Sequence, residues 1–190
     1  MEDVRAMSVT ARRSGRTRTA VTAALLAALL AASAQISIPI GAVPITLQVF
    51  IVLLAGLLLP PRGAFAAVAV YILLGAVGLP VFAGGLGGVG VLVGPTGGYL
   101  WGFALGATVV ALARGPLVAA VGRSVGEAIA LFIGVVVIYV VGWTQLAAVT
   151  GMGAVPAFVA GVVPFALLDL AKAVVALGVA GALRRAGVAT

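Results

Sequence analysis

The chain alternates long apolar runs with short breaks that are rich in proline, glycine or arginine. A helix that crosses a bilayer needs about 20 predominantly apolar residues, and somewhat shorter runs also occur. The pattern therefore predicts an all-α membrane protein with six transmembrane helices. The six runs lie at about residues 20–36, 46–59, 64–79, 97–113, 128–141 and 164–185.

Basic residues fall on one side of this pattern. Five arginines precede the first run, and the connections after the first, third and fifth runs contain no lysine or arginine. Cytoplasmic loops carry the excess of basic residues, so both termini are expected in the cytoplasm of a multi-pass inner (plasma) membrane protein. The other basic residues on the predicted cytoplasmic side are Arg62, Arg114, Arg123, Arg184 and Arg185.

The predicted domain organisation follows from the same pattern. Residues 1–19 are expected to form a basic cytoplasmic tail, either disordered or lying on the membrane surface, and residues 186–190 a cytoplasmic C-terminus. Residues 20–185 form the transmembrane domain. The first run also resembles a signal peptide, because Ala32-Ser33-Ala34 fits an A-x-A cleavage pattern.

The first run carries a stripe of alanines that favours its retention as a helix. Small residues at every fourth position allow a second helix to approach closely, which is how helices associate in lipid. The stripe therefore predicts that another helix packs against it, either from this fold or from a partner protein. Its members are Ala20, Ala24, Ala28 and Ala32.

The breaks between the runs predict the connections. Residues 37–46 contain two prolines and a glycine, which indicates irregular backbone. Residues 80–99 contain eight glycines and no charge, and are expected to form either a flexible external loop or a lid over a ligand. Residues 114–127 are expected to form a polar connection. Residues 144–163 are expected to form an outer connection with one short surface helix, after which Pro164 begins the last helix.

The amino-acid composition limits the partners and the catalytic chemistry that the chain can have. The chain is 64% hydrophobic with a net charge of +7, and its arginines follow the membrane pattern, so nucleic acid is not expected as a partner. It has no cysteine, no histidine and only four acidic residues, which argues against thiol or imidazole catalysis and against a metal or other cofactor. An intramembrane enzyme is therefore a weak alternative.

Asp169 and Lys172 are the two charged residues in the middle of an apolar run. They are three residues apart, so on a helix they point to nearly the same side. Charges inside a membrane helix are costly and usually mark a functional site that faces other helices or water. The alternative is a neutralised structural pair that holds two helices together.

Other polar residues are expected to meet this pair on the outer side. The predicted ligand-binding residues, in addition to Asp169 and Lys172, are Thr46, Gln48, Gly84, Gly85, Thr96 and Tyr99. Such a pocket would be mostly apolar with a few fixed donors and acceptors. A cyclic urea or amide on an apolar body fits these side chains better than a sugar or an ion.

Several motifs resemble the BioY family, the biotin-specific S components of energy-coupling factor (ECF) transporters. The similarity covers about residues 20–185. The motifs are VP-x-TLQ at residues 43–48, GLPVFAGG at 78–85, GPTGGY at 94–99 and the D-x-x-K of the last run. Members of that family commonly have Pro-Gly directly before the aspartate, where this chain has Leu167-Leu168.

The resemblance implies an S-component-like fold with an outward-facing biotin pocket. It also implies partnership with a membrane coupling protein, which the alanine stripe would face, and with cytoplasmic ATPases. In that case Asp169 accepts the ureido N–H groups and Lys172 donates to the ureido oxygen, or Lys172 instead meets the carboxylate. The chain has no Walker A motif, so ATPase partners supply the energy unless it is a solitary transporter. Another small-molecule transporter and a structural membrane subunit remain as alternatives.

Overall fold

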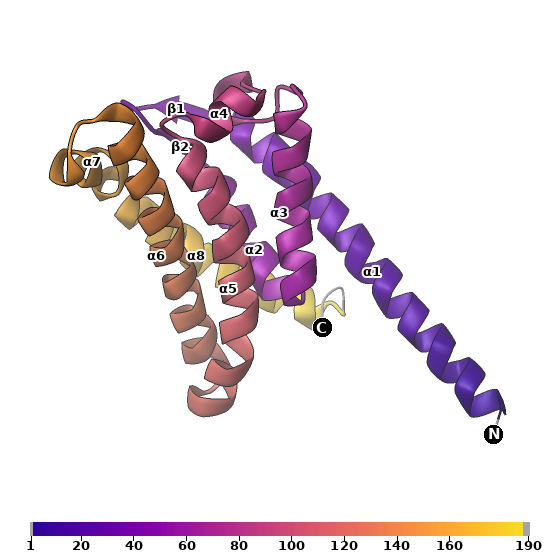
Figure 1. Cartoon of the computed structure of the whole chain (residues 1–190). Coiled ribbons are helices and arrows are strands. Elements are labelled where there is room, and N and C mark those ends of the chain that lie inside the picture. The colour runs from indigo at the N-terminus through magenta and orange to yellow at the C-terminus, as the bar shows by residue number, and fades with distance from the viewer. Residues whose placement is uncertain (1, 188–190) are drawn as a thin grey trace.

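The computed structural model describes the backbone of residues 2–187 and the side chains of residues 15–187. It is a bundle of helices with one small β-hairpin, and the all-α expectation is confirmed apart from that hairpin (Figure 1). The hairpin, α4 and α7 lie at one end of the bundle, and the α5–α6 turn lies at the other. The elements are α1 (Glu2–Gln35), β1 (Ser37–Pro39), β2 (Pro44–Thr46), α2 (Gln48–Leu58), α3 (Pro61–Ala76), η1 (Ala83–Gly85), α4 (Val89–Val93), α5 (Gly97–Val121), α6 (Arg123–Thr150), α7 (Ala154–Gly161) and α8 (Val163–Arg185).

All six predicted apolar runs are helical, but they differ in length. Four helices are long and apolar enough to cross a membrane: α1 from Gly15 onward, α5, α6 and α8. Helices α2 and α3 are shorter, at 11 and 16 residues. Nine of the 11 residues of α2 are buried, which explains why its sequence is apolar on every face. The number of membrane crossings therefore stays a prediction.

Two predicted irregular segments are ordered. Helix α1 already begins at Glu2, so residues 2–19 are helical and not irregular, and their place at the membrane surface stays a prediction. Alanine, arginine and glutamate are good helix formers, and the segment 2–19 contains no proline to stop the helix. Residues 37–46 form an antiparallel hairpin, in which Ser37 pairs with Thr46 and Pro39 with Pro44.

The predicted polar connection at residues 114–127 is almost entirely helical. Helix α5 continues to Val121 and α6 starts at Arg123, so Gly122 alone separates them. Gly122 has a φ of 83°, a conformation that glycine adopts without steric cost. The polar side chains of this segment are compatible with a helix, and the chain turns only at that glycine.

From α6 onward the sequence prediction agrees better with the structure. Helix α6 extends past the expected end at residue 141 to Thr150, and the expected short helix follows as α7. Pro164 is the second residue of α8, in the first turn, where its missing N–H costs nothing.

Helices α5 and α6 pack closely along a row of glycines. Gly98, Gly102 and Gly106 recur at every fourth position of α5 and face α6. A Cβ atom at Gly102 would lie 2.9 Å from the carbonyl oxygen of Ile138. Small residues at this spacing let two helix backbones approach in lipid. This interface holds the side chains of both helices that line the cavity described below.

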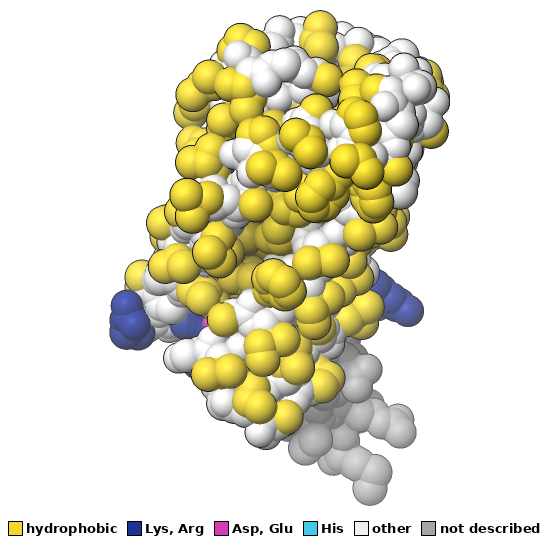
Figure 2. All heavy atoms as spheres, turned by 90° about the vertical axis from the view of Figure 1, so that its left-hand side faces the viewer, with side chains coloured by type: hydrophobic (Ala, Val, Ile, Leu, Met, Phe, Trp, Pro, Cys, Tyr) yellow, Lys and Arg dark blue, Asp and Glu magenta, His cyan; other side chains and the backbone are white. Residues whose placement is uncertain are grey.

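Arginines gather at the end of the bundle that contains the α5–α6 turn. Arg114 donates from Nη1 to the carbonyl of Leu57 at 2.6 Å, at the C-terminal end of α2. Arg184 pairs with Glu127 at 2.8 Å between α8 and α6. On the face seen in Figure 2, dark blue Lys and Arg atoms lie only in the lower part and hydrophobic side chains dominate above them. This distribution supports the predicted division into a basic side and an uncharged side.

The glycine row predicts a specific sensitivity to added volume. Gly102→Ala should destabilise the protein by about 1–3 kcal/mol, because its Cβ meets the rigid backbone of α6. Gly178→Ala in α8 is the control, since nothing lies within 4 Å of a Cβ there. Thermal unfolding in detergent should show a lower midpoint for Gly102→Ala and an unchanged or higher one for Gly178→Ala. Equal midpoints would contradict the proposed close contact.

Candidate ligand-binding site

Asp169 and Lys172 form an ion pair inside the bundle. Their side chains lie one turn apart on α8, with Lys172 Nζ 2.6 Å from Asp169 Oδ1. Asp169 is only 2% exposed, and the Lys172 side chain is 12% exposed. The expected proximity of the two charges is therefore present, and both are shielded by other helices. Each charge neutralises the other where water is scarce.

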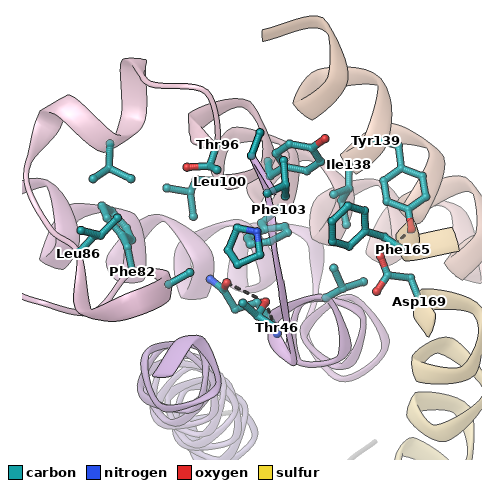
Figure 3. A pocket seen from close by; sticks show the side chains of 18 of the residues that line it. Thr46, Phe82, Leu86, Thr96, Leu100, Phe103, Ile138, Tyr139, Phe165 and Asp169 are labelled. Carbon is teal, nitrogen blue, oxygen red and sulfur yellow. Dashed lines mark hydrogen bonds between the residues drawn. The ribbon is translucent and has the colours of Figure 1, made fainter. Parts of the chain in front are cut away.

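A third residue, which the sequence did not reveal, completes this arrangement. The hydroxyl of Tyr139 on α6 donates to Asp169 Oδ2 at 2.6 Å, and Figure 3 shows the ring pointing at the carboxylate (Figure 3). Each carboxylate oxygen thus has one partner and can accept a further hydrogen bond. The only signal in the sequence is a hydroxyl group within an otherwise apolar run.

Thr46 and Gln48 form a second polar group at the start of α2. Thr46 Oγ1 donates to Gln48 Oε1 at 2.9 Å, and Gln48 Nε2 donates to the hydroxyl of Tyr71 at 2.6 Å. Thr46 and Gln48 are buried. The ring of Tyr71 packs edge-on against Phe82 at a centroid distance of 5.5 Å. These contacts fix the Gln48 amide in one orientation, with its remaining donor and acceptor capacity available.

Both polar groups face one cavity of about 210 Å³. Apolar and aromatic side chains make up most of its wall, as is usual for small-molecule sites. Figure 3 shows Phe82, Leu86 and Leu100 on one side and Ile138, Tyr139 and Phe165 on the other. The lining residues are Ala42, Val43, Pro44, Thr46, Gln48, Val49, Phe82, Ala83, Leu86, Val91, Thr96, Tyr99, Leu100, Phe103, Ile138, Tyr139, Phe165, Asp169 and Lys172.

Six of the eight residues expected at the site line this cavity, and two do not. Gly84 and Gly85 are absent from its wall, where their neighbours Ala83 and Leu86 are found. Both glycines have positive φ angles, 70° and 72°, so they form the turn at η1 instead of a wall. Tyr99 lines the cavity, but its hydroxyl donates to the carbonyl of Gly161 at 2.8 Å and thereby holds α7.

The glycine-rich segment is held in place over one side of the site. The amide of Gln145 on α6 donates to the carbonyls of Leu92 and Gly94, both at 2.9 Å. Trp101 Nε1 also donates to Leu92 at 3.2 Å. The backbone N–H of Gly88 donates to the carbonyl of Gly75 at 2.7 Å. These bonds hold the segment against the bundle, and its role as a lid over a ligand stays a prediction.

The alanine stripe of α1 lies on the outer surface. Ala20, Ala24, Ala28 and Ala32 are all exposed along the helix. The neighbouring alanines Ala23 and Ala27 are buried instead, in the core shared by the helices. The stripe is therefore not used for packing within the described part of this chain. No group of three or more potential metal-binding His, Cys, Asp or Glu side chains occurs among the described residues.

Proteins from several organisms are similar to this chain. A probable biotin transporter BioY from Pyrococcus horikoshii is 42% identical over 161 residues, which cover 85% of this chain and 93% of that protein. The biotin transporter BioY from Rhizobium etli is 39% identical over 168 residues, which cover 84% of this chain and 89% of that protein. The biotin transporter BioY from Thermotoga maritima is 56% identical over 95 residues, half of this chain.

A solved structure has the same fold. It is the crystal structure of the S-component for biotin from an ECF-type ABC transporter, and it matches with a TM-score of 0.83 and 26% sequence identity. The match covers 90% of this chain and 93% of that chain. The expected S-component-like fold is therefore confirmed. The sequence model of the BioY family matches residues 5–188, and this protein belongs to the BioY family.

Proposed function

We propose that this protein is the biotin-binding membrane subunit of an ECF-type vitamin uptake transporter. The observation that carries the proposal is the Asp169–Lys172 pair, which faces a mostly apolar cavity between helices. A biotin head group offers two N–H donors and a carbonyl acceptor on a compact apolar ring system. The relatives named biotin transporter and the solved S-component for biotin support the same ligand. The family is one of transport components, and this chain is accordingly not an enzyme.

The cavity matches the two ends of this ligand. Asp169 can accept the ureido N–H groups, because each carboxylate oxygen has one partner and retains acceptor capacity. Lys172 can donate to the ureido oxygen, and Gln48 can donate or accept. In the reversed orientation, Lys172 meets the ligand carboxylate. Phe82, Phe103 and Phe165 supply the apolar wall that either orientation needs.

We infer the orientation in the membrane from the distribution of charges. The arginines lie at the end of the bundle that contains the α5–α6 turn, and the cavity is lined by the hairpin and the glycine-rich segment of the other end. With the basic end in the cytoplasm, six membrane crossings place both termini inside and the cavity on the outer side. The protein then captures biotin outside the cell and delivers it with a coupling protein and ATPases. A solitary transporter remains the second candidate.

Removing either charge tests the site directly. Asp169→Asn and Lys172→Ala should each weaken biotin binding by more than about tenfold, since each loses a hydrogen bond to a charged group. Isothermal titration of detergent-purified protein with biotin provides the measurement. Leu170→Ala, at an exposed position of the same helix, is the control and should bind as wild type. Wild-type affinity for biotin in both charge variants would show that the ligand does not bind at Asp169 and Lys172.

Tyr139→Phe isolates the contribution of the hydroxyl group. The change removes the donor to Asp169 Oδ2 but keeps the ring in the cavity wall. Biotin binding should weaken by up to about tenfold, as expected for one hydrogen bond, and by less than in Asp169→Asn. The same titration measures it. A loss equal to that of Asp169→Asn would show that Tyr139 does more than position the carboxylate.

The exposed alanine stripe predicts where the coupling protein binds. Ala24→Leu combined with Ala28→Leu should leave biotin binding intact and disrupt co-purification of the coupling protein, because larger side chains prevent close helix approach. Ala128→Leu combined with Ala148→Leu adds the same volume at exposed positions of α6 and is the matched control. Unchanged co-purification of the stripe variant would place the coupling protein elsewhere.

A further inference from the structure

Two hollows lie between α5, α6 and α8 at the arginine-rich end, away from the ligand cavity. Their volumes are about 340 and 460 Å³. They share three lining residues, Arg123, Glu127 and Arg184, so they adjoin each other and are together called the depression below. Arg114 lines the first hollow and Arg185 the second. The biotin site uses none of these residues.

The depression is strongly positive. Four arginines and one glutamate line it, which leaves an excess of three positive charges. Glu127 is neutralised by Arg184, whose Nη1 lies 2.8 Å from Glu127 Oε1. The side chains of both residues are largely buried, with exposed fractions of 12% for Arg184 and 8% for Glu127. The unbalanced charge therefore belongs to Arg114, Arg123 and Arg185.

One donor in this depression lacks an acceptor. Arg184 Nη2 is buried and has no hydrogen-bond partner among the described residues. A buried donor without a partner is costly, and guanidinium groups pair best with planar or tetrahedral oxyanions. Arg114 is fixed nearby by its bonds to the carbonyls of Leu57 and Leu59, at 2.6 and 3.4 Å. The exposed Arg123 can turn toward an anion held between them.

The surroundings identify the class of anion. The depression opens at the ends of long apolar helices, where lipid headgroups lie. Exposed hydrophobic residues are sequence neighbours of its lining residues, among them Leu112 next to Ala111 on α5 and Val125 next to Ser124 on α6. An anion with an attached acyl chain satisfies both features, whereas a free ion satisfies only the charge. We infer that this depression binds the phosphate of an anionic phospholipid headgroup.

The inference is tested with the full-length protein in a mild detergent. Native mass spectrometry should detect bound phosphatidylglycerol when this lipid is added to the micelles, and much less phosphatidylcholine. Arg123→Gln should weaken the affinity for phosphatidylglycerol about fivefold, as expected for removal of one basic residue at an anionic surface. Arg62→Gln, an exposed arginine of α3 that does not line the depression, is the control and should retain the lipid. Equal losses of bound phosphatidylglycerol in Arg123→Gln and Arg62→Gln would contradict a lipid site in the depression.

A second variant tests the role of the buried Arg184–Glu127 pair in lipid binding. Arg184→Gln alone strands the buried Glu127 charge, so it is combined with Glu127→Gln. The double variant should elute as wild type in size-exclusion chromatography and lose phosphatidylglycerol as Arg123→Gln does. Retention of the lipid by this variant would contradict the role of Arg184. The test does not depend on biotin binding, so the two proposals can fail separately.

Two further arms separate the lipid from other anions. Inorganic phosphate at millimolar concentration should neither displace phosphatidylglycerol nor raise the unfolding temperature, since it lacks the acyl chain. Displacement of phosphatidylglycerol by inorganic phosphate would contradict a lipid site and indicate that the depression binds free phosphate. Loss of the coupling protein, but not of lipid, in Arg123→Gln would reassign it to an acidic protein partner.

Discussion

An ion pair in the apolar interior of a helical bundle constrains everything around it. Removing a carboxylate and an ammonium from water costs several kcal/mol for each, and only close pairing with further hydrogen bonds offsets that cost. Asp169 and Lys172 meet this condition because they are one helical turn apart on α8 and because Tyr139 reaches across from α6. The rest of the fold keeps lipid away from the pair and leaves a cavity in front of it.

The packing of the helices keeps that cavity in a fixed shape. The glycine row of α5 brings the backbone of α6 close, and both helices contribute a tyrosine, Tyr99 and Tyr139, to the wall of the cavity. Helix α2 is buried on nearly all sides and presents Gln48 with its amide fixed by Tyr71. A small ligand therefore meets donors and acceptors whose positions are already set, so little conformational freedom is lost on binding.

The sequence revealed the features that stand out against an apolar background. Asp169 and Lys172 are conspicuous as charges, and their spacing alone predicts contact on a helix. Tyr139 and the glycine row were missed, because their roles depend on which helices become neighbours. Polar residues between Arg114 and Glu127 suggested a connection between two membrane helices, yet they are compatible with a helix and only Gly122 breaks it. Gly84 and Gly85 were expected at the ligand, but they do not line the cavity, and their positive φ angles form a turn beside it.

A structure of the purified protein with biotin bound would show where the ligand lies. Biotin is expected within the cavity between α2, α5, α6 and α8, with one of its polar ends within hydrogen-bonding distance of Asp169 and Lys172. Tyr139 is expected to stay bonded to the carboxylate. Biotin bound elsewhere, or in this cavity with only apolar groups facing the pair, would contradict this expectation.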